Sequence, residues 1–478
     1  MRSMLYRLFP LLCLPLLAFG QAEATYQTDF TPAEFKTRWQ KIFTKIGGES
    51  VAVLQGVPLT NGFSMPRQSN EFYYLCGIET PHSYLLLDGR NQKATLYLPP
   101  RNPRLERSEG KVLSAEDANQ VKQLTGVDEV LSTDAIRDDW FGKLSGGAPR
   151  TIYTLFSPAE GNSQSRFELQ NANASIATDY WDGRLPRETQ FANLIRARYP
   201  RATVLDLTAT LDEMRSVKSP AEIAVIRRAS QIAGMGLLEA MRSTKPGIYE
   251  YQLDAAARYI YLVNGARLEG YRSIAASGTQ NIWNAHYYRN NRRMDGGDLV
   301  LFDYAPEYRY YTSDIGRVWP VNGKYTAVQR ELLQFVLEYR NVVMKLLVPG
   351  STPRQILDDA KKAMAPILAR SKFSKPVYEQ AAKKLIETGG GVLSHPVGMT
   401  VHDDGPYGPG PLKPGHVLSI DPQLWVPEEN LYVRYEDVVA ITTSGYENFT
   451  SFLPTELDDL EKLVKQGGGV VEKIPARP

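Results

Sequence analysis

The order of apolar and polar positions divides the chain into two regions with different patterns. In the first region, short apolar runs bounded by polar residues are typical of strands, and they lie at residues 72–77, 83–88 and 94–99. Helical periodicity alternates with these runs over residues 32–46 and 115–125. Strands that alternate with helices predict an α/β domain, which we place at residues 25–214.

A helix start marks the beginning of the second region. Ser219, Pro220 and Glu222 supply an N-cap, a first-turn proline and a capping-box acid, in the order that begins a helix. Periodic apolar positions predict three more helices, over residues 249–264, 325–347 and 353–369. β-Branched and aromatic runs elsewhere in this region predict strands. We therefore expect a second domain of mixed helices and strands at residues 215–466.

The N-terminus has the features of an export signal. Two arginines precede an apolar run at residues 8–19, and small residues follow it, with expected cleavage points at Gly20 or Ala24. The run is too short to span a bilayer comfortably, although a membrane anchor is the alternative interpretation. We expect residues 1–24 to be removed, leaving a secreted or periplasmic protein with no membrane attachment.

Length and composition narrow the class of protein. A chain of 478 residues with 43% hydrophobic and 23% charged residues is typical of a soluble globular protein with two domains. The net charge of +2 gives no electrostatic reason to expect nucleic acid as a partner. After removal of the signal, Cys76 is the only cysteine, so neither an intrachain disulfide nor a multi-cysteine metal site is expected. Residues 467–478 are expected to form a flexible tail.

The candidate chemistry lies in the last third of the chain. Its potential metal ligands are Asp303, Asp314, His395, Asp421 and Glu436. The first two interrupt β-branched and aromatic runs, which predicts neighbouring antiparallel strands joined by a turn at residues 306–308. Four acids and one imidazole that face one cavity cannot all be accommodated in charged form without cations. Oxygen ligands with one nitrogen suit manganese, iron, cobalt or zinc, and the excess of carboxylates favours two ions.

The same residues carry a resemblance to a known family. The order Asp, Asp, His, acid, Glu, with His395 and His402 seven positions apart and Arg434 two before Glu436, resembles the pita-bread metallopeptidases. Within them the chain is most similar to the Xaa-Pro aminopeptidase and prolidase branch, and residues 67–75 resemble the N-terminal domain of creatinase and aminopeptidase P. The resemblance covers nearly the whole mature chain. It implies an α/β N-terminal domain followed by an α+β pita-bread catalytic domain.

The resemblance also implies a two-metal site. Asp303 would bind one ion, His395 and Asp421 the other, and Asp314 and Glu436 would bridge them. Manganese is the expected metal, with zinc, cobalt and iron as alternatives. A hydroxide held between the ions would attack the scissile carbonyl, because metal binding lowers the pKa of water to roughly 7.

Further residues have roles implied by the resemblance. Asp421 or Glu436 would take the proton of the water and pass it to the leaving nitrogen. His286 and His402 would bind the substrate and stabilise the tetrahedral intermediate. His402 has an alternative role in orienting its loop or Asp421. Arg434 would pair either with a ligand carboxylate or with a carboxylate of the substrate.

Two positions depart from the family pattern. Asp421 stands where the family usually has a glutamate, and its shorter side chain can ligate if the strand shifts or a water intervenes. Gly391 stands where some relatives carry another histidine.

The expected function is removal of an N-terminal residue that precedes proline, by an enzyme that forms a homodimer or homotetramer. A prolidase specific for dipeptides is the nearest alternative. A metal-free creatinase-like hydrolase and a catalytically weakened binding protein of the same fold are the others.

Overall fold

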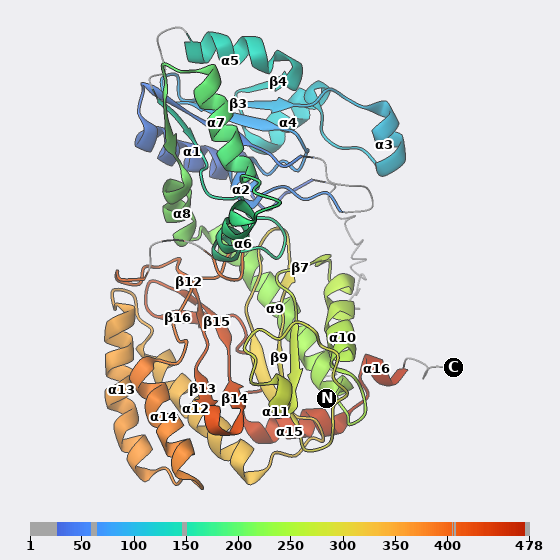
Figure 1. Cartoon of the computed structure of the whole chain (residues 1–478), viewed down its shortest axis with the longest axis vertical. Coiled ribbons are helices and arrows are strands. Elements are labelled where there is room, and N and C mark those ends of the chain that lie inside the picture. The colour runs from blue at the N-terminus through green and yellow to red at the C-terminus, as the bar shows by residue number, and fades with distance from the viewer. Residues whose placement is uncertain (1–25, 59–64, 146–150, 404, 406–407, 474–478) are drawn as a thin grey trace, which may run out of the picture.

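Figure 1 shows the computed structural model of the chain, which describes residues 26–58, 65–145, 151–403, 405 and 408–473. The predicted export signal at residues 1–24 lies outside these residues. The N-terminal domain lies at the top of Figure 1 and the C-terminal domain below it. Among the described residues, no helix combines the length and the apolar character needed to cross a membrane.

The N-terminal domain is built on a six-stranded sheet with the order β4-β3-β2-β1-β5-β6. Its strands are β1 (Ser50–Gln55), β2 (Tyr84–Asp88), β3 (Lys93–Leu98), β4 (Glu129–Ser132), β5 (Thr151–Thr154) and β6 (Thr203–Asp206). Strands β1, β2 and β3 pair antiparallel, whereas β4, β5 and β6 run parallel to their neighbours. The predicted strands at residues 83–88 and 94–99 are therefore confirmed.

Helices cover both faces of this sheet, because successive side chains of a strand point to opposite sides. Ala52 and Leu54 of β1 belong to a core that includes α1, α2, α4 and α8, while Val51 and Val53 belong to a core that includes α5 and α7. The helices of the domain are α1 (Pro32–Ile46), α2 (Asn70–Cys76), α3 (Pro103–Glu109), α4 (Ala118–Thr125), α5 (Ile136–Ser145), α6 (Arg166–Thr178), α7 (Arg187–Arg198) and α8 (Thr208–Ser216). The predicted α/β organisation is confirmed.

One predicted strand is wrong. Residues 72–77 belong to helix α2 and to the glycine that ends it, Gly77, whose φ of +64° lies in the left-handed region. Every residue of α2 is buried. A helix buried on all sides has no polar face, so its sequence shows the continuous apolar run that is also typical of a buried strand.

The C-terminal domain contains several small antiparallel sheets between two groups of helices. Its strands are β7 (Leu268–Glu269), β8 (Ile274–Ser277), β9 (Leu299–Asp303), β10 (Pro306–Glu307), β11 (Gly316–Pro320), β12 (Val417–Ile420), β13 (Gln423–Val426), β14 (Leu431–Arg434), β15 (Asp437–Ile441) and β16 (Tyr446–Asn448). They form the sheets β11-β9-β8 and β12-β15-β16 and the pairs β10-β7 and β13-β14. The strands of both larger sheets end at the cavity described below.

The helices of this domain lie on opposite sides of the strands, with α12, α13 and α14 on one side and α9 and α10 on the other (Figure 1). They are α9 (Pro220–Ser243), α10 (Glu250–Val263), α11 (Gly278–Asn281), α12 (Ala327–Leu346), α13 (Pro353–Arg370), α14 (Pro376–Thr388), α15 (Leu457–Gln466) and α16 (Val470–Lys473). Helix α9 begins with the predicted capping box of Ser219 and Glu222. The predicted helices near residues 249–264, 325–347 and 353–369 are likewise confirmed.

The prediction of a flexible tail from residue 467 is wrong for the described part of that segment. Residues 470–473 form α16, in which Val471 is buried and the backbone N–H of Val470 donates to the carboxylate of Glu239 on α9. Residues 474–478 lie outside the described residues. Packing against α9 stabilises this short helix, and the sequence of the segment alone does not reveal that contact.

The turn between β9 and β11 is also misplaced in the prediction. Pro306 and Glu307 form β10, and the chain reverses at Arg309 and Tyr310, whose φ values of +52° and +70° lie in the left-handed region. Asp303 ends β9 as expected, but Asp314 lies in the segment before β11 instead of on the strand. Non-glycine residues are uncommon in this backbone region, so tertiary contacts must hold the turn.

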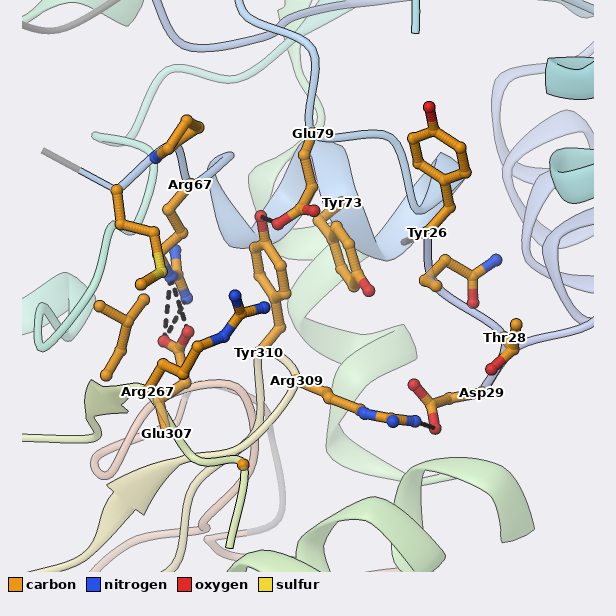
Figure 2. A pocket seen from close by; sticks show the side chains of 15 residues that line it. Tyr26, Thr28, Asp29, Arg67, Tyr73, Glu79, Arg267, Glu307, Arg309 and Tyr310 are labelled. Atoms are coloured by element: carbon orange, nitrogen blue, oxygen red, sulfur yellow. Dashed lines mark hydrogen bonds and ion pairs between the residues drawn. The ribbon is translucent and has the colours of Figure 1, made fainter. Parts of the chain in front are cut away.

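Figure 2 shows these contacts, which join the turn to the N-terminal domain. The ring of Tyr310 stacks on Tyr73 with centroids 3.5 Å apart, and its hydroxyl donates to the Glu79 carboxylate at 2.9 Å. Beside it, Arg67 pairs with Glu307 at 2.7 Å. The hairpin that leads to Asp314 is therefore anchored in the other domain.

The same groups enclose a small cavity of about 110 Å³ at the domain junction. Arg309 closes one side of it through an ion pair with Asp29 at 2.6 Å (Figure 2). None of the described residues lines both this cavity and the one that contains the predicted metal ligands. It is a feature of the domain junction and not of the predicted site.

Candidate metal centre

A second cavity, of about 330 Å³, contains all the residues for which the sequence predicted a role. These residues are His286, Asp303, Asp314, His395, His402, Asp421, Arg434 and Glu436. The structure therefore brings together residues that are spread over 150 positions of the sequence, from 286 to 436. Their individual roles stay predictions, but their common location is a property of the fold.

The ends of paired strands bring the four acids together. Strands β9 and β11 pair with Asp303 opposite Gly316, so Asp314, two residues before Gly316, lies near the end of β9. Strands β12 and β15 pair with Ile420 opposite Asp437. Asp421 follows the first residue of that pair and Glu436 precedes the second, so both lie at the same end of their sheet.

Three of the predicted ligands lie within reach of one cation. Asp314, His395 and Glu436 each offer one ligand atom, and these atoms lie within 4.8 Å of one another. The Nδ1 atom of His395 is 3.1 Å from the carbonyl oxygen of Pro396, to which it must donate a proton. Nε2 of His395 then carries the lone pair and lies 3.5 Å from Oδ2 of Asp314. This is the tautomer that a metal ligand needs.

Burial and the repulsion between neighbouring acids make it costly to ionise the carboxylates of the predicted metal ligands. Burial, and after it the negative charge of Glu436, raise the pKa of Asp314 and of Asp421 well above their ordinary values. Burial, and after it the charge of His402, lower the pKa of His395 to about 4. His395 is therefore neutral at neutral pH, and a bound cation would relieve the cost of ionising the two acids.

Arg434 supplies part of the positive charge. Its guanidinium pairs with Asp303, lies 3.3 Å from Oδ2 of Asp421 and lies 3.5 Å from Oε2 of Glu436. Of the two predicted roles of Arg434, the structure shows the pairing with carboxylates of the chain itself. Asp303 also accepts a hydrogen bond of 2.6 Å from the hydroxyl of Tyr271.

The donor set fits a divalent cation. Among the described residues, Oδ1 of Asp421 and Oε2 of Glu436 are buried without a hydrogen-bond partner. Oε2 of Glu436 has the ion pair with Arg434 at 3.5 Å but no hydrogen bond from any described residue, so it and Oδ1 of Asp421 can still accept a cation. A side chain at Gly316 would place its Cβ 3.0 Å from Oε2 of Glu436, so this glycine leaves room for the acid. The trio fits one ion. The assignment of Asp303 to one ion and of His395 and Asp421 to another, with Asp314 and Glu436 bridging them, stays a prediction.

The predicted substrate-binding histidines lie on the wall of the same cavity. The ring of His402 has its centroid 4.5 Å from that of His395 and 6.2 Å from that of His286. Burial, followed by the charge of His402, lowers the pKa of His286. Imidazoles placed beside a metal-binding trio can donate or accept hydrogen bonds at a reacting carbonyl.

Several other residues of the cavity had no predicted role. They are Ser163, Ser165, Glu168, Tyr271, Arg272, Ile274, Tyr288, Ser394, Val401 and Gln423. Three of them, Ser163, Ser165 and Glu168, come from the N-terminal domain, so that domain forms part of the wall. Residues from another domain have no fixed spacing to the ligands, and no motif search could have found them.

A buried cluster of carboxylates and an imidazole that can hold a metal ion is typical of metal-dependent hydrolases. Comparisons with known proteins agree with this class. Residues 35–153 match the model of the aminopeptidase P N-terminal domain, and residues 224–443 match the model of metallopeptidase family M24.

The chain is similar to full-length relatives. It is 30% identical over 464 residues to the Xaa-Pro aminopeptidase of Haemophilus influenzae, covering 92% of this chain and 99% of the relative. Aminopeptidase P from E. coli with the inhibitor Pro-Leu superimposes with a TM-score of 0.73 at 28% identity, covering 92% and 99% of the two chains. The zinc-substituted E. coli enzyme in complex with product gives the same values.

The chain belongs to metallopeptidase family M24, in its aminopeptidase P branch. It is a metallo-exopeptidase with an aminopeptidase P N-terminal domain and a pita-bread catalytic domain, and its family uses divalent metal ions.

Proposed function

We propose that this protein is an exported Xaa-Pro aminopeptidase, which hydrolyses the bond between an N-terminal residue and a following proline. The observation that carries the proposal is the trio of Asp314, His395 and Glu436 beside His286 and His402 in one cavity. The similarity to Xaa-Pro aminopeptidases over nearly their whole length supports the choice of substrate.

The proposed cofactors are two divalent ions, with manganese as the first candidate and zinc, cobalt or iron as alternatives. Asp314, His395 and Glu436 would hold them together with Asp303 and Asp421. When bound, such ions lower the pKa of a water to roughly 7, which supplies hydroxide at neutral pH, and they polarise a carbonyl.

The side chains of the chain then have separate tasks. Glu436 and Asp421 each have a carboxylate oxygen with no hydrogen-bond partner among the described residues, and one of them would accept the proton of the attacking water. His286 and His402 would bind the scissile carbonyl and the oxygen that becomes negative in the tetrahedral intermediate. Arg434 would hold Asp303 and Asp421 in place, because it already pairs with both.

The test is metal analysis combined with activity on a matched pair of peptides, Xaa-Pro-Yaa and Xaa-Pro. Two metals per chain and cleavage of the tripeptide after its first residue are expected. Cleavage of the dipeptide alone would replace the proposal with a prolidase. One metal or none, with neither peptide cleaved, would favour the catalytically weakened protein.

A pair of variants ties the activity to this cavity. Asp314→Asn removes a charged ligand and should abolish both metal retention and cleavage. Asp138→Asn removes a carboxylate that is 81% exposed and should change neither. Equal activity of the two variants would place the reaction elsewhere in the molecule.

Export and assembly are proposed on separate grounds. The charged and apolar segments of residues 1–24 support cleavage near Ala24, and N-terminal sequencing of protein from the periplasm or medium tests it. The side chains of Phe167, Tyr180 and Trp181 are 67%, 88% and 90% exposed, which supports a homo-oligomer that covers them. Light scattering on the purified protein should then give a dimer or tetramer instead of a monomer.

A further inference from the structure

A contact between the domains reaches into the catalytic cavity. Glu168 lies in the first turn of α6 in the N-terminal domain, and its Oε1 is 2.9 Å from Nδ1 of His402. A carboxylate at neutral pH only accepts hydrogen bonds, so Nδ1 must carry the proton. Nε2 then remains as the ring nitrogen that is available for a group bound in the cavity.

The position of α6 is fixed by buried charges. Arg166, the first residue of α6, is 3% exposed and pairs with Glu71 at 3.0 Å, with Glu160 at 3.5 Å and with Asp212. Breaking a buried ion pair by removing one partner is costly, which makes this anchor rigid. Glu168 is only two residues further along the same helix turn, so its backbone has little freedom to move.

The loop that carries His402 is held from outside the catalytic domain as well. The backbone N–H of His402 donates to Oγ of the buried Ser165 at 3.3 Å. The next residue, Asp403, pairs with Arg215 of α8 and with Lys218 at 3.0 Å. The ring, the backbone and the neighbouring residue of His402 are therefore held at three points, and the N-terminal domain contributes to each, through Glu168, Ser165 and Arg215.

We propose that Glu168 is a positioning residue, which fixes the proton of His402 on Nδ1 and turns Nε2 toward the substrate. The N-terminal domain then does more than form a wall of the cavity, because Glu168 orients a side chain of the catalytic domain. The role of His402 toward substrate rests on the proposed function. The hydrogen bond itself does not, so the two can fail independently.

Three variants separate positioning from other roles. Glu168→Gln keeps an oxygen that can accept from Nδ1, so it should retain kcat and KM within about threefold of the unchanged enzyme. Glu168→Ala removes the acceptor and should lower kcat about 10- to 100-fold at nearly constant KM, by analogy with the loss typical when a partner that orients a metal-bound imidazole is removed. Asn171→Ala, on the exposed part of the same helix, is the matched control and should match the unchanged enzyme.

A spectroscopic measurement reads the tautomer without using activity. The chain has five histidines, so nitrogen-15 spectra of the histidine-labelled, zinc-loaded enzyme can be assigned with His402→Gln. We expect a protonated Nδ1 at His402 in the unchanged enzyme and in Glu168→Gln, and its loss in Glu168→Ala.

Several outcomes would overturn the proposal. An unchanged tautomer or unchanged kcat in Glu168→Ala would show that the contact positions nothing. Equal losses in Glu168→Gln and Glu168→Ala, or a rise in KM alone, would identify Glu168 as a direct contact of the substrate. If the unchanged enzyme cleaves no Xaa-Pro peptide, the proposed function fails, while the nitrogen-15 spectra still decide the role of Glu168.

Discussion

Gly391 offers the sharpest test of how the backbone shapes the metal centre. It follows α14 with a φ of +89°, and a Cβ at this position would lie 2.9 Å from the carbonyl oxygen of Asp421. The same Cβ would lie 2.8 Å from Nε2 of Gln423. Gly391→Ala therefore forces both a strained backbone and a displacement next to a predicted ligand.

The cost of the strained backbone and the cost of the steric crowding can be estimated separately. A left-handed backbone costs a residue with a Cβ roughly 1–2 kcal/mol. Overpacking costs about 1–3 kcal/mol more where the neighbouring atom belongs to the backbone and cannot turn away. Gly350 has a φ of +91°, and no described atom lies within 4 Å of the position of its Cβ. Gly350→Ala should therefore show the first cost alone.

The assay is urea denaturation of the two variants, monitored by circular dichroism, which gives the free energy of unfolding of each. Gly391→Ala should be less stable than Gly350→Ala by about 1–3 kcal/mol. It should also lose peptidase activity, because Asp421 must move, whereas Gly350→Ala should keep it. Equal losses of stability in the two variants, or full activity in Gly391→Ala, would refute the crowding at this position. Gly391→His should destabilise the protein at least as much as Gly391→Ala.

Two further predictions concern charge. Asp437 is buried between Arg317 at 2.7 Å and Arg340 at 2.6 Å. Burial alone would raise the pKa of Asp437, but the charges of the two arginines, that of Arg317 most of all, lower it to about 2. Asp437→Asn should cost roughly 3–5 kcal/mol in the free energy of unfolding at pH 7. The difference from the unchanged protein should shrink by about 2 kcal/mol as the pH falls from about 4 to below 2, and a constant difference would contradict the pairing. Asp314 and Asp421 have the opposite effect on stability, because their pKa values are raised in the folded protein. Above a pH of about 4 the unfolded chain loses these protons more readily than the folded one, so the metal-free protein should lose stability as the pH rises. Manganese should therefore raise the melting temperature more at pH 7.5 than at pH 5. Calorimetry with manganese and with a chelator measures this shift, and an equal shift at the two pH values would count against Asp314 and Asp421 as ligands.

Local patterns in the sequence determined much of the fold. Ser219 and Glu222 act on the backbone within one helix turn, so the start of α9 is readable without any tertiary contact. The same holds for the apolar strands β2 and β3, whose alternation with helices gave the α/β class. The pattern failed at α2, because a helix that is buried on all sides has no polar face to reveal its period.

Tertiary contacts overrode the local signals elsewhere. The turn at Arg309 and Tyr310 uses left-handed backbone without glycine, which only the stacking on Tyr73 and the other junction contacts make acceptable. Residues 470–473 fold as α16 because Val471 is buried against the rest of the domain. In both cases the stabilising partner is hundreds of residues away or on another helix, so the segment itself carries no signal.

The sequence by itself determined the kinds and the order of the chemical groups in the catalytic domain, since the acids and histidines of that domain that line the cavity could be chosen from their motifs. Only the tertiary structure decided how they are arranged. It placed Arg434 among three acids and left one oxygen each of Asp421 and Glu436 without a hydrogen bond from any residue that the structure describes. It also brought Glu168 to His402 from another domain. The physical reason is that burial, charge balance and hydrogen bonding depend on distances between segments, and a linear pattern does not contain those distances.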